Sequence, residues 1–157
     1  MISRLRYCAL ACSVAGTLAL GGSALASSPF HGTTIPAQTD VVSSGDVVPV
    51  TLKCPTGTIA HCVGLLVLKT SKPVAVGSRH EILQLGSHGF LIAPGKTSIV
   101  NTKISAEGVK LLKPDGRLVP NAITTSRDGV GHRVVTSRLI HVRNPGLLPA
   151  PPPTPTY

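Results

Sequence analysis

Four cysteines carry the most reactive side chains of this chain, and they fall into two pairs. Cys8 and Cys12 lie near the N-terminus, whereas Cys54 and Cys62 lie on either side of seven residues further along. Two thiols at either spacing could form a disulfide or contribute to a metal site. No cluster of histidines or acids completes a ligand set around Cys54 and Cys62, because His61 is adjacent and alone. We therefore predict a Cys54–Cys62 disulfide, with no metal and no other cofactor.

The histidines and carboxylates do not form a pattern typical of catalysis. Most acids fall in predicted turns, linkers or a helix first turn, so a carboxylate pair for hydrolysis is poorly supported. No nucleophile-elbow motif accompanies the histidines, and His80 and His88, which flank one β segment, lack a third zinc ligand. We predict no catalytic residues, and a small secreted hydrolase is the last of three alternatives. The groups considered are Asp40, Asp46, Glu81, Glu107, Asp115, Asp128, His31, His61, His80, His88, His132 and His141.

The first 26 residues have the three parts of a secretory signal peptide. Arg4 and Arg6 form a basic region, residues 7–20 are mostly apolar, and Ala24-Leu25-Ala26 is a small-x-small cleavage pattern. The apolar run is shorter than the roughly 18 residues of a spanning helix, which leaves a retained anchor as the weaker alternative. Cleavage before Ser27 would remove the N-terminal cysteine pair. We expect a secreted or extracytoplasmic protein associated with the cell envelope, in a compartment where the remaining cysteines oxidise.

The mature chain is basic along its whole length. Removal of 26 of the 157 residues leaves 131, which is one domain's worth, with 13 Lys and Arg against 6 acids and a net charge of +7. The positive charges are spread out, without the block of five or six that is typical of a nucleic-acid tail. Such a charge favours association with anionic envelope polymers or lipid surfaces. Solubility alone is the alternative explanation.

Aromatic side chains are scarce. After signal cleavage only Phe30, Phe90 and Tyr157 remain, and the pattern around Phe90 predicts a core position. Single-stranded nucleic acid is usually held by base stacking on aromatic rings, and sugars are often held in a similar way. We therefore expect no nucleic acid among the partners.

The two central cysteines lie in two apolar segments, and the pattern of each segment predicts a strand. In residues 46–54, Val48, Val50, Leu52 and Cys54 alternate with polar positions, and Pro49 favours an edge strand.

In residues 62–70 one face carries Cys62, Gly64, Leu66 and Leu68. The other face carries Val63, Leu65 and Val67 and is apolar as well. The pattern predicts a strand that is central in its sheet or covered on both sides.

The remaining segments predict more strands and one helix. Pro94-Gly95 is a type II turn, Ser105 caps a helix over 106–112, and Asp128-Gly129 lies at the tip of a hairpin. The predicted strands cover residues 80–85, interrupted at Gly86, then 89–93, 97–104, 117–126 and 133–142.

About seven short strands in about 100 residues predict an all-β fold, an immunoglobulin-like two-sheet sandwich with one short helix. A small barrel is the alternative. The domain is expected over residues 45–143. Residues 27–44 are rich in Ser, Thr and Pro and predict a linker or a loosely attached first strand. Residues 144–157, with six Pro among the last 13 residues, predict a disordered tail.

Several segments of the predicted domain combine turns, the cysteine pair and core positions. They are Val50-Thr51-Leu52-Lys53-Cys54-Pro55, Cys62-Val63-Gly64-Leu65-Leu66-Val67-Leu68, Leu85-Gly86 followed by Phe90, Ala93-Pro94-Gly95-Lys96, Ile104-Ser105-Ala106-Glu107-Gly108 and Lys110-Leu111-Leu112. Over residues 46–143 the chain resembles the immunoglobulin-like β-sandwich modules of exported proteins from high-GC Gram-positive bacteria. That resemblance implies a fold and no functional site.

Together these features favour an exported, non-catalytic structural or interaction module of the cell envelope or secreted space. Its expected partners are anionic envelope polymers or another exported protein. The second alternative is a ligand-binding protein that uses loops 71–79 and 127–133 at one end of the sandwich. The oligomeric state stays open at this point.

Overall fold

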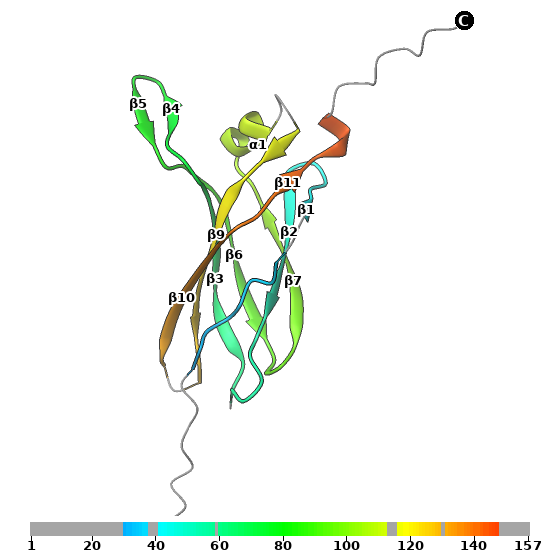
Figure 1. The fold of residues 1–157 in the computed structure, drawn as a ribbon, viewed down its shortest axis with the longest axis vertical. Helices are drawn as coiled ribbons and strands as arrows, with labels where there is room; N and C mark the ends of the chain where they lie inside the picture. Colours follow the sequence, from blue (N-terminus) through cyan, green and yellow to red (C-terminus); the bar gives the residue numbers. More distant parts are fainter. Residues whose placement is uncertain (1–29, 38–40, 59, 113–115, 130, 148–157) are drawn as a thin grey trace, which may run out of the picture.

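The structure is a computed structural model that describes residues 30–37, 41–58, 60–112, 116–129 and 131–147. It is mostly β, with one short helix and several open sheets (Figure 1). The predicted signal peptide, residues 1–26, and residues 148–157 of the predicted tail lie outside the described residues. None of the helices in the described ranges is long and apolar enough to cross a membrane.

The elements follow one another along the chain in a mostly antiparallel arrangement. They are β1 (Val41–Val42), β2 (Val47–Lys53), β3 (Cys62–Thr70), β4 (Val74–Val76), β5 (Arg79–Glu81), β6 (Gln84–Ile92), β7 (Thr97–Lys103), α1 (Ala106–Leu112), β8 (Arg117–Leu118), β9 (Pro120–Arg127), β10 (Arg133–Leu139), β11 (Val142–Arg143) and a 3-10 turn at Pro145–Leu147.

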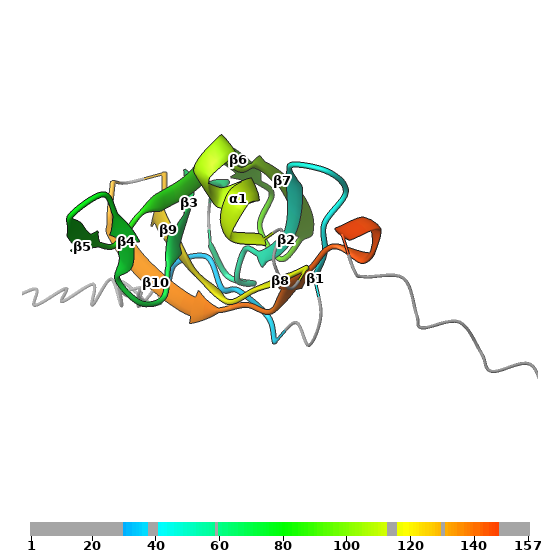
Figure 2. The same cartoon turned by 90° about the horizontal axis from the view of Figure 1, so that it is seen from above.

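The largest sheet has four strands in the order β10-β9-β3-β6. β3 lies between β9 and β6, so the central position predicted for residues 62–70 is confirmed. β2 pairs with β7, β1-β11-β8 form a small third sheet, and β4 and β5 form a hairpin that extends away from the body (Figure 1). Seen from above, β2 and β7 lie across from the four-stranded sheet (Figure 2).

One hydrophobic core lies between these two sheets. Val48, Val50 and Leu52 of β2 are at most 1% exposed, as the alternation in residues 46–54 predicts. They belong to the same buried cluster as Leu66 and Leu68 of β3. Other members from β6, β7, α1 and β9 are Leu85, Phe90, Ile92, Val100, Leu112 and Ala122.

The segment before β2 is packed into the fold. The backbone N–H groups of Thr34 and Lys53 each donate to the other residue's carbonyl at 2.9 Å, and Ile35 is buried. Further along, β1 pairs in parallel with β11. The described part of residues 27–44 is therefore packed against the fold, through an isolated bridge at Thr34 and the two-residue strand β1.

Gly86 does not interrupt a strand, contrary to the prediction. It lies inside β6, which runs unbroken from Gln84 to Ile92. A side chain at this position would collide with the backbone carbonyl of Lys103, and Gly86 forms a β-bridge with Ile104. The glycine therefore permits a close approach of two backbones, which is a second common use of glycine in strands.

The last two predicted strands are each divided in two. Residues 117–126 correspond to β8 and β9, separated at Val119, and residues 133–142 correspond to β10 and β11, separated at Ile140 and His141. β9 and β10 pair in the four-stranded sheet, whereas β8 and β11 pair in the third sheet. The change of sheet accounts for two of the four strands beyond the expected seven, and the other two are β1 and β4.

The helix is confirmed with its predicted cap. α1 begins after Ser105, whose hydroxyl accepts a hydrogen bond from the N–H of Gly108 at 3.2 Å. This bond satisfies one of the backbone donors that the first turn of a helix leaves free. Gly108 and Leu112 are the buried residues of the helix and face the core.

Asn144 is the last residue that the structure shows to be buried. Its backbone N–H donates to the Gly116 carbonyl at 2.8 Å, and its side-chain amide donates to the Gly45 carbonyl at 3.2 Å. We predict that deletion of residues 145–157 lowers the free energy of unfolding by less than about 0.5 kcal/mol, because Pro145 and Gly146 are exposed and chain ends usually add little. The matched comparison is the same deletion with Asn144→Ala, which should cost a further ~1 kcal/mol or more. Loss of cooperative thermal unfolding in the first variant would contradict this boundary.

Candidate functional site

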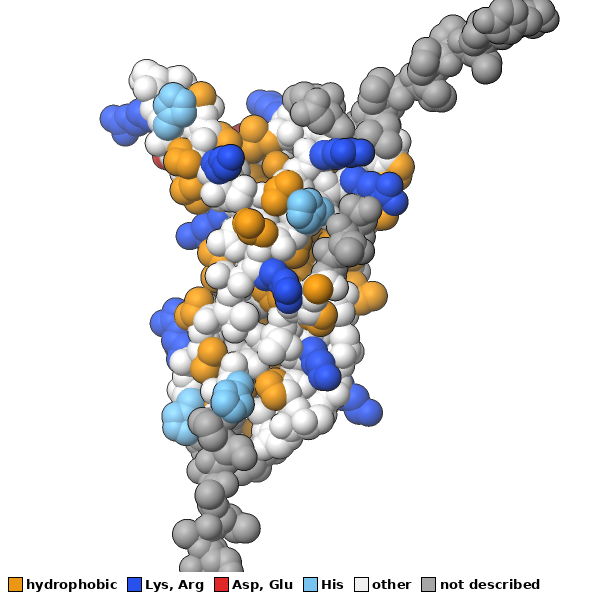
Figure 3. All heavy atoms as spheres, in the orientation of Figure 1, with side chains coloured by type: hydrophobic (Ala, Val, Ile, Leu, Met, Phe, Trp, Pro, Cys, Tyr) orange, Lys and Arg blue, Asp and Glu red, His pale blue; other side chains and the backbone are white. Residues whose placement is uncertain are grey.

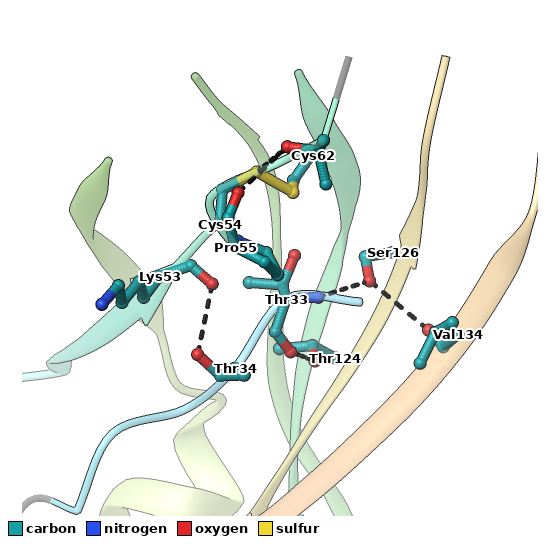
Figure 4. Close-up of a disulfide and its surroundings, with 10 residues drawn as sticks. Thr33, Thr34, Lys53, Cys54, Pro55, Cys62, Thr124, Ser126 and Val134 are labelled. Atoms are coloured by element: carbon teal, nitrogen blue, oxygen red, sulfur yellow. Dashed lines mark hydrogen bonds between the residues drawn. A yellow bond between two sulfur atoms is a disulfide. The ribbon is translucent and has the colours of Figure 1, made fainter. Parts of the chain in front are cut away.

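The cysteines 54 and 62 form the predicted disulfide. Cys54 follows β2 and Cys62 begins β3, their Cα atoms are 5.8 Å apart, and both residues are fully buried. Figure 4 shows the bond near the segment that contains Thr33 and Thr34, where the Thr33 N–H donates to the Ser126 hydroxyl at 2.9 Å. The bond joins the end of one sheet to the start of the other. Both thiols are consumed, so neither acts as a nucleophile or a metal ligand.

The histidines predicted to flank one β segment lie in different sheets. His80 is opposite Ala75 in the β4–β5 hairpin, whereas His88 is opposite Leu66 in the middle of β6. Both residues are exposed. Across the part of the chain that the structure describes, no group of three or more His, Cys, Asp or Glu residues could hold a metal ion.

One histidine does meet a carboxylate. His132 Nδ1 is 2.8 Å from one Asp128 oxygen, and the His132 N–H donates to the other at 2.8 Å. The pair closes the β9–β10 hairpin. The nearby Ser126 hydroxyl is buried and donates to the Val134 carbonyl at 3.5 Å, so it is not presented as a nucleophile.

The two loops proposed for ligand binding do not share one end of the molecule. β3 and β9 are antiparallel, with Thr70 opposite Pro120 and Val63 opposite Arg127. Residues 71–79 therefore continue from one end of β3, and residues 127–133 lie at the other end (Figure 1). A binding site built from both loops is excluded by this placement.

A pocket lies between β6, β7 and α1. Its lining includes apolar residues such as Leu85, Ile104 and Val109 and the polar residues Gln84 and Ser87. Asp46 and Lys103 also line it and form an ion pair at 3.2 Å. Ser105 also lines it, but its hydroxyl caps the helix. Asp46, Lys103 and Ser105 thus have structural partners, and the remaining polar side chains of the lining, Gln84 and Ser87, are not ionisable.

The outward side of the four-stranded sheet is the most unusual surface of the described structure. Val63 and Leu65 of β3 are 51% and 45% exposed, although they lie in the central strand of the sheet. Leu91 of β6, opposite Val63, is 67% exposed. We name this surface the outer face and define its apolar part as Val63, Leu65, Val67, Leu91, Ile123, Val135 and Leu139.

The register places these side chains in adjoining rows across the sheet. One row is Gly89, Leu65, Thr125 and Val135, and the next is Ser87, Val67, Ile123 and Ser137. Neighbours on one face of a sheet are close enough to touch. The apolar side chains therefore form a connected patch and are not scattered singly.

Lys and Arg side chains lie in two rows of the outer face. Arg127 and Arg133 lie in the row of Val63 and Leu91, at the hairpin end. Lys69 lies in the row of Leu139, at the opposite end. On the side of the molecule that Figure 3 shows, where β10 lies in front, Lys and Arg are spread from one end to the other and little acidic surface is visible.

The β2–β7 sheet has no comparable surface. Of the large apolar side chains that are exposed, only Ile99, at 63%, lies on these two strands. On that side Thr51, Asn101 and Lys103 are polar or charged, and the apolar residues Val47 and Pro49 are half-buried. The apolar outer face is thus a property of one sheet and not of the whole surface.

The sequence indicated the outer face only in part. The apolar second side of residues 62–70 was recognised, and the alternative that it is covered by the chain is wrong because Val63 and Leu65 are exposed. The contributions of Leu91, Val135 and Leu139 became visible only with the strand register. Comparison with protein-family models and with curated proteins finds no match to this chain.

Proposed function

We propose that the protein is an exported, non-catalytic interaction module of the cell envelope that binds an anionic envelope surface through its outer face. The observation that carries the proposal is the uncovered apolar patch on a central strand. Apolar side chains on one connected surface are usually a sign of a binding site. Burial of such a surface in a complex is favourable, at about 25 cal/mol per Å² of apolar area.

The charges on the outer face favour an anionic partner. Arg127 and Arg133 at one end and Lys69 at the other flank the apolar rows. A surface of aliphatic chains with phosphate or carboxylate head groups offers both kinds of contact. Positive residues near such a surface contribute roughly 1 kcal/mol each, and salt weakens that contribution.

The immunoglobulin-like sandwich remains the architecture that we favour. Its support is a single core shared by the inward sides of two sheets and a disulfide that joins them. A disulfide is also compatible with the export that the N-terminal sequence predicts. In this proposal the fold is a rigid frame and the outer face is the site.

The test is sedimentation of the mature protein with vesicles that contain phosphatidylglycerol, compared with vesicles of phosphatidylcholine alone. We expect binding to the anionic vesicles, weakened by added salt. Substitution of both Val63→Ser and Leu91→Ser should reduce it about tenfold, because the two residues are neighbours at the exposed end of the patch.

Ile99→Ser is the matched control, since Ile99 is similarly exposed on the other sheet. Binding should survive this change. Equal binding by the outer-face variant and the control, or no preference for anionic vesicles, would overturn the proposal. Retained binding of a purified exported protein by the same face, without vesicle binding, would point to a protein partner instead.

A further inference from the structure

β10 is the outermost strand of the four-stranded sheet, and the register shows which of its backbone groups have no partner among the described residues. At one end Asp128 N–H donates to the His132 carbonyl at 3.2 Å, and at the other Ile140 N–H donates to the Pro120 carbonyl at 3.0 Å. Antiparallel pairs alternate between bonded and non-bonded residues. The even-numbered residues 134, 136 and 138 therefore bond to β9, and the odd-numbered ones point their N–H and C=O groups away from it.

Those outward groups belong to Arg133, Val135, Ser137 and Leu139, and all four residues are exposed. Side-chain bonds agree with the assignment, since Thr124 and Ser126 donate to the carbonyls of Thr136 and Val134 on the β9 side. An edge of this length with unpaired donors and acceptors is a template for another strand.

The sheet margins at β2 and β6 carry features that block such pairing. β2 has Pro49 in its middle and is bridged to Thr34 and Ser44 on its free side. β6 is bridged to Ile104 at Gly86, and its register with β3 shifts near Leu68. β10 has no proline, and its register with β9 is continuous.

We propose that β10 pairs with β10 of a second copy of this chain, in antiparallel orientation about a two-fold axis at Thr136. In this register Arg133 is opposite Leu139 of the second copy, and Val135 is opposite Ser137 of the second copy. Every outward residue then faces another outward residue, so all the free backbone groups are satisfied. The two four-stranded sheets become one continuous sheet.

Charge and side-chain chemistry allow this register. Arg133 meets a leucine and Arg138 is opposite Val134 of the second copy, so no like charges lie directly opposite each other. The Arg138 guanidinium is already engaged, because it donates to the Ile35 carbonyl at 2.7 Å. The net positive charge of the chain opposes association, and salt should therefore strengthen the dimer. This inference does not depend on the proposed vesicle binding.

The test is sedimentation equilibrium of the mature protein with two variants of one residue. Ser137→Pro removes an outward N–H without removing a bond to β9, whereas Ser137→Ala keeps that N–H. We expect the wild-type chain and Ser137→Ala to dimerise alike. Ser137→Pro should weaken the dimer about tenfold or more, because each of the two copies then loses the hydrogen bond donated by its residue 137 N–H. Circular dichroism and the melting temperature show whether each variant is folded.

A cysteine at the two-fold axis tests the register. Thr136 would be a non-hydrogen-bonded pair with itself, at a Cα separation of about 4.5 Å that a disulfide can span. We expect Thr136→Cys to form an oxidised dimer, and Thr125→Cys, on the inner strand β9, to remain monomeric under the same conditions. A monomeric wild-type chain at high salt, a dimer insensitive to Ser137→Pro, or no link in Thr136→Cys would each overturn the proposal. A monomer that instead binds an extended synthetic peptide, lost in Ser137→Pro, would assign the edge to a different partner.

Discussion

Leu66→Ala is expected to lower the free energy of unfolding by about 2–5 kcal/mol, and Leu65→Ala by less than about 1 kcal/mol. The two residues are adjacent in β3 and chemically identical. Leu66 is completely buried among the core residues, whereas Leu65 is 45% exposed on the outer face. Truncation of Leu66 leaves a cavity between the two sheets, but truncation of Leu65 leaves only solvent.

The measurement is urea unfolding of both variants at one protein concentration, with the slope compared as well as the midpoint. Equal losses would show that the outer face is buried, either by residues outside the described ranges or by association of the chain with itself. A concentration-dependent loss in Leu65→Ala alone would identify self-association across this face. Either result would remove the uncovered patch on which the vesicle experiment rests.

Much of the fold could be predicted because local patterns in this chain agree with its packing. Alternation places Val48, Val50 and Leu52 in the core, and Ser105 caps the helix where the sequence indicates. The cysteine pair is bonded as expected. In each of these places the signal lies within a few neighbouring residues, so nothing distant overrides it.

What the sequence did not predict depends on distant partners. In the sequence Gly86 indicates a break in a strand. In the structure it lies within β6, where the Lys103 backbone packs closely against it. The divisions at Val119 and Ile140 arise because the strands change from one sheet to another, and β1 pairs with β11, a hundred residues later. The prediction that loops 71–79 and 127–133 lie at one end was wrong. Their positions at opposite ends follow from the antiparallel register of β3 and β9, which the sequence alone does not reveal.

The outer face shows how register turns a local pattern into a surface. Within residues 62–70 an apolar second side is compatible with a covered strand or an exposed one. The pairing of β3 with β6 and β9 adds Leu91 and Ile123, and that of β9 with β10 adds Val135. The same pairing leaves the odd-numbered backbone groups of β10 free. Both proposals therefore arise from one sheet, one from its surface and one from its edge.

Removal of the disulfide should be the second large effect on stability. We expect the double variant Cys54→Ala, Cys62→Ala to lose about 2–3 kcal/mol, which is the chain-entropy value for a loop of this size. The two cysteines are only eight positions apart, so the loop closed in the unfolded chain is short. The bond nevertheless joins β2 to β3 across the core, and few aromatic side chains are present to compensate for its loss.

Thermal unfolding with and without a reductant separates the contributions. The oxidised wild-type chain should melt higher than the reduced one, and the double variant should melt at one temperature under both conditions. The single variant Cys54→Ser serves as the comparison, because it removes the bond and leaves a buried thiol and a buried hydroxyl. If reduced and oxidised wild-type chains melt alike, the bond is not a stabilising element. The end of β2 would then be held by the Cys54–Lys96 and Thr34–Lys53 backbone bonds instead.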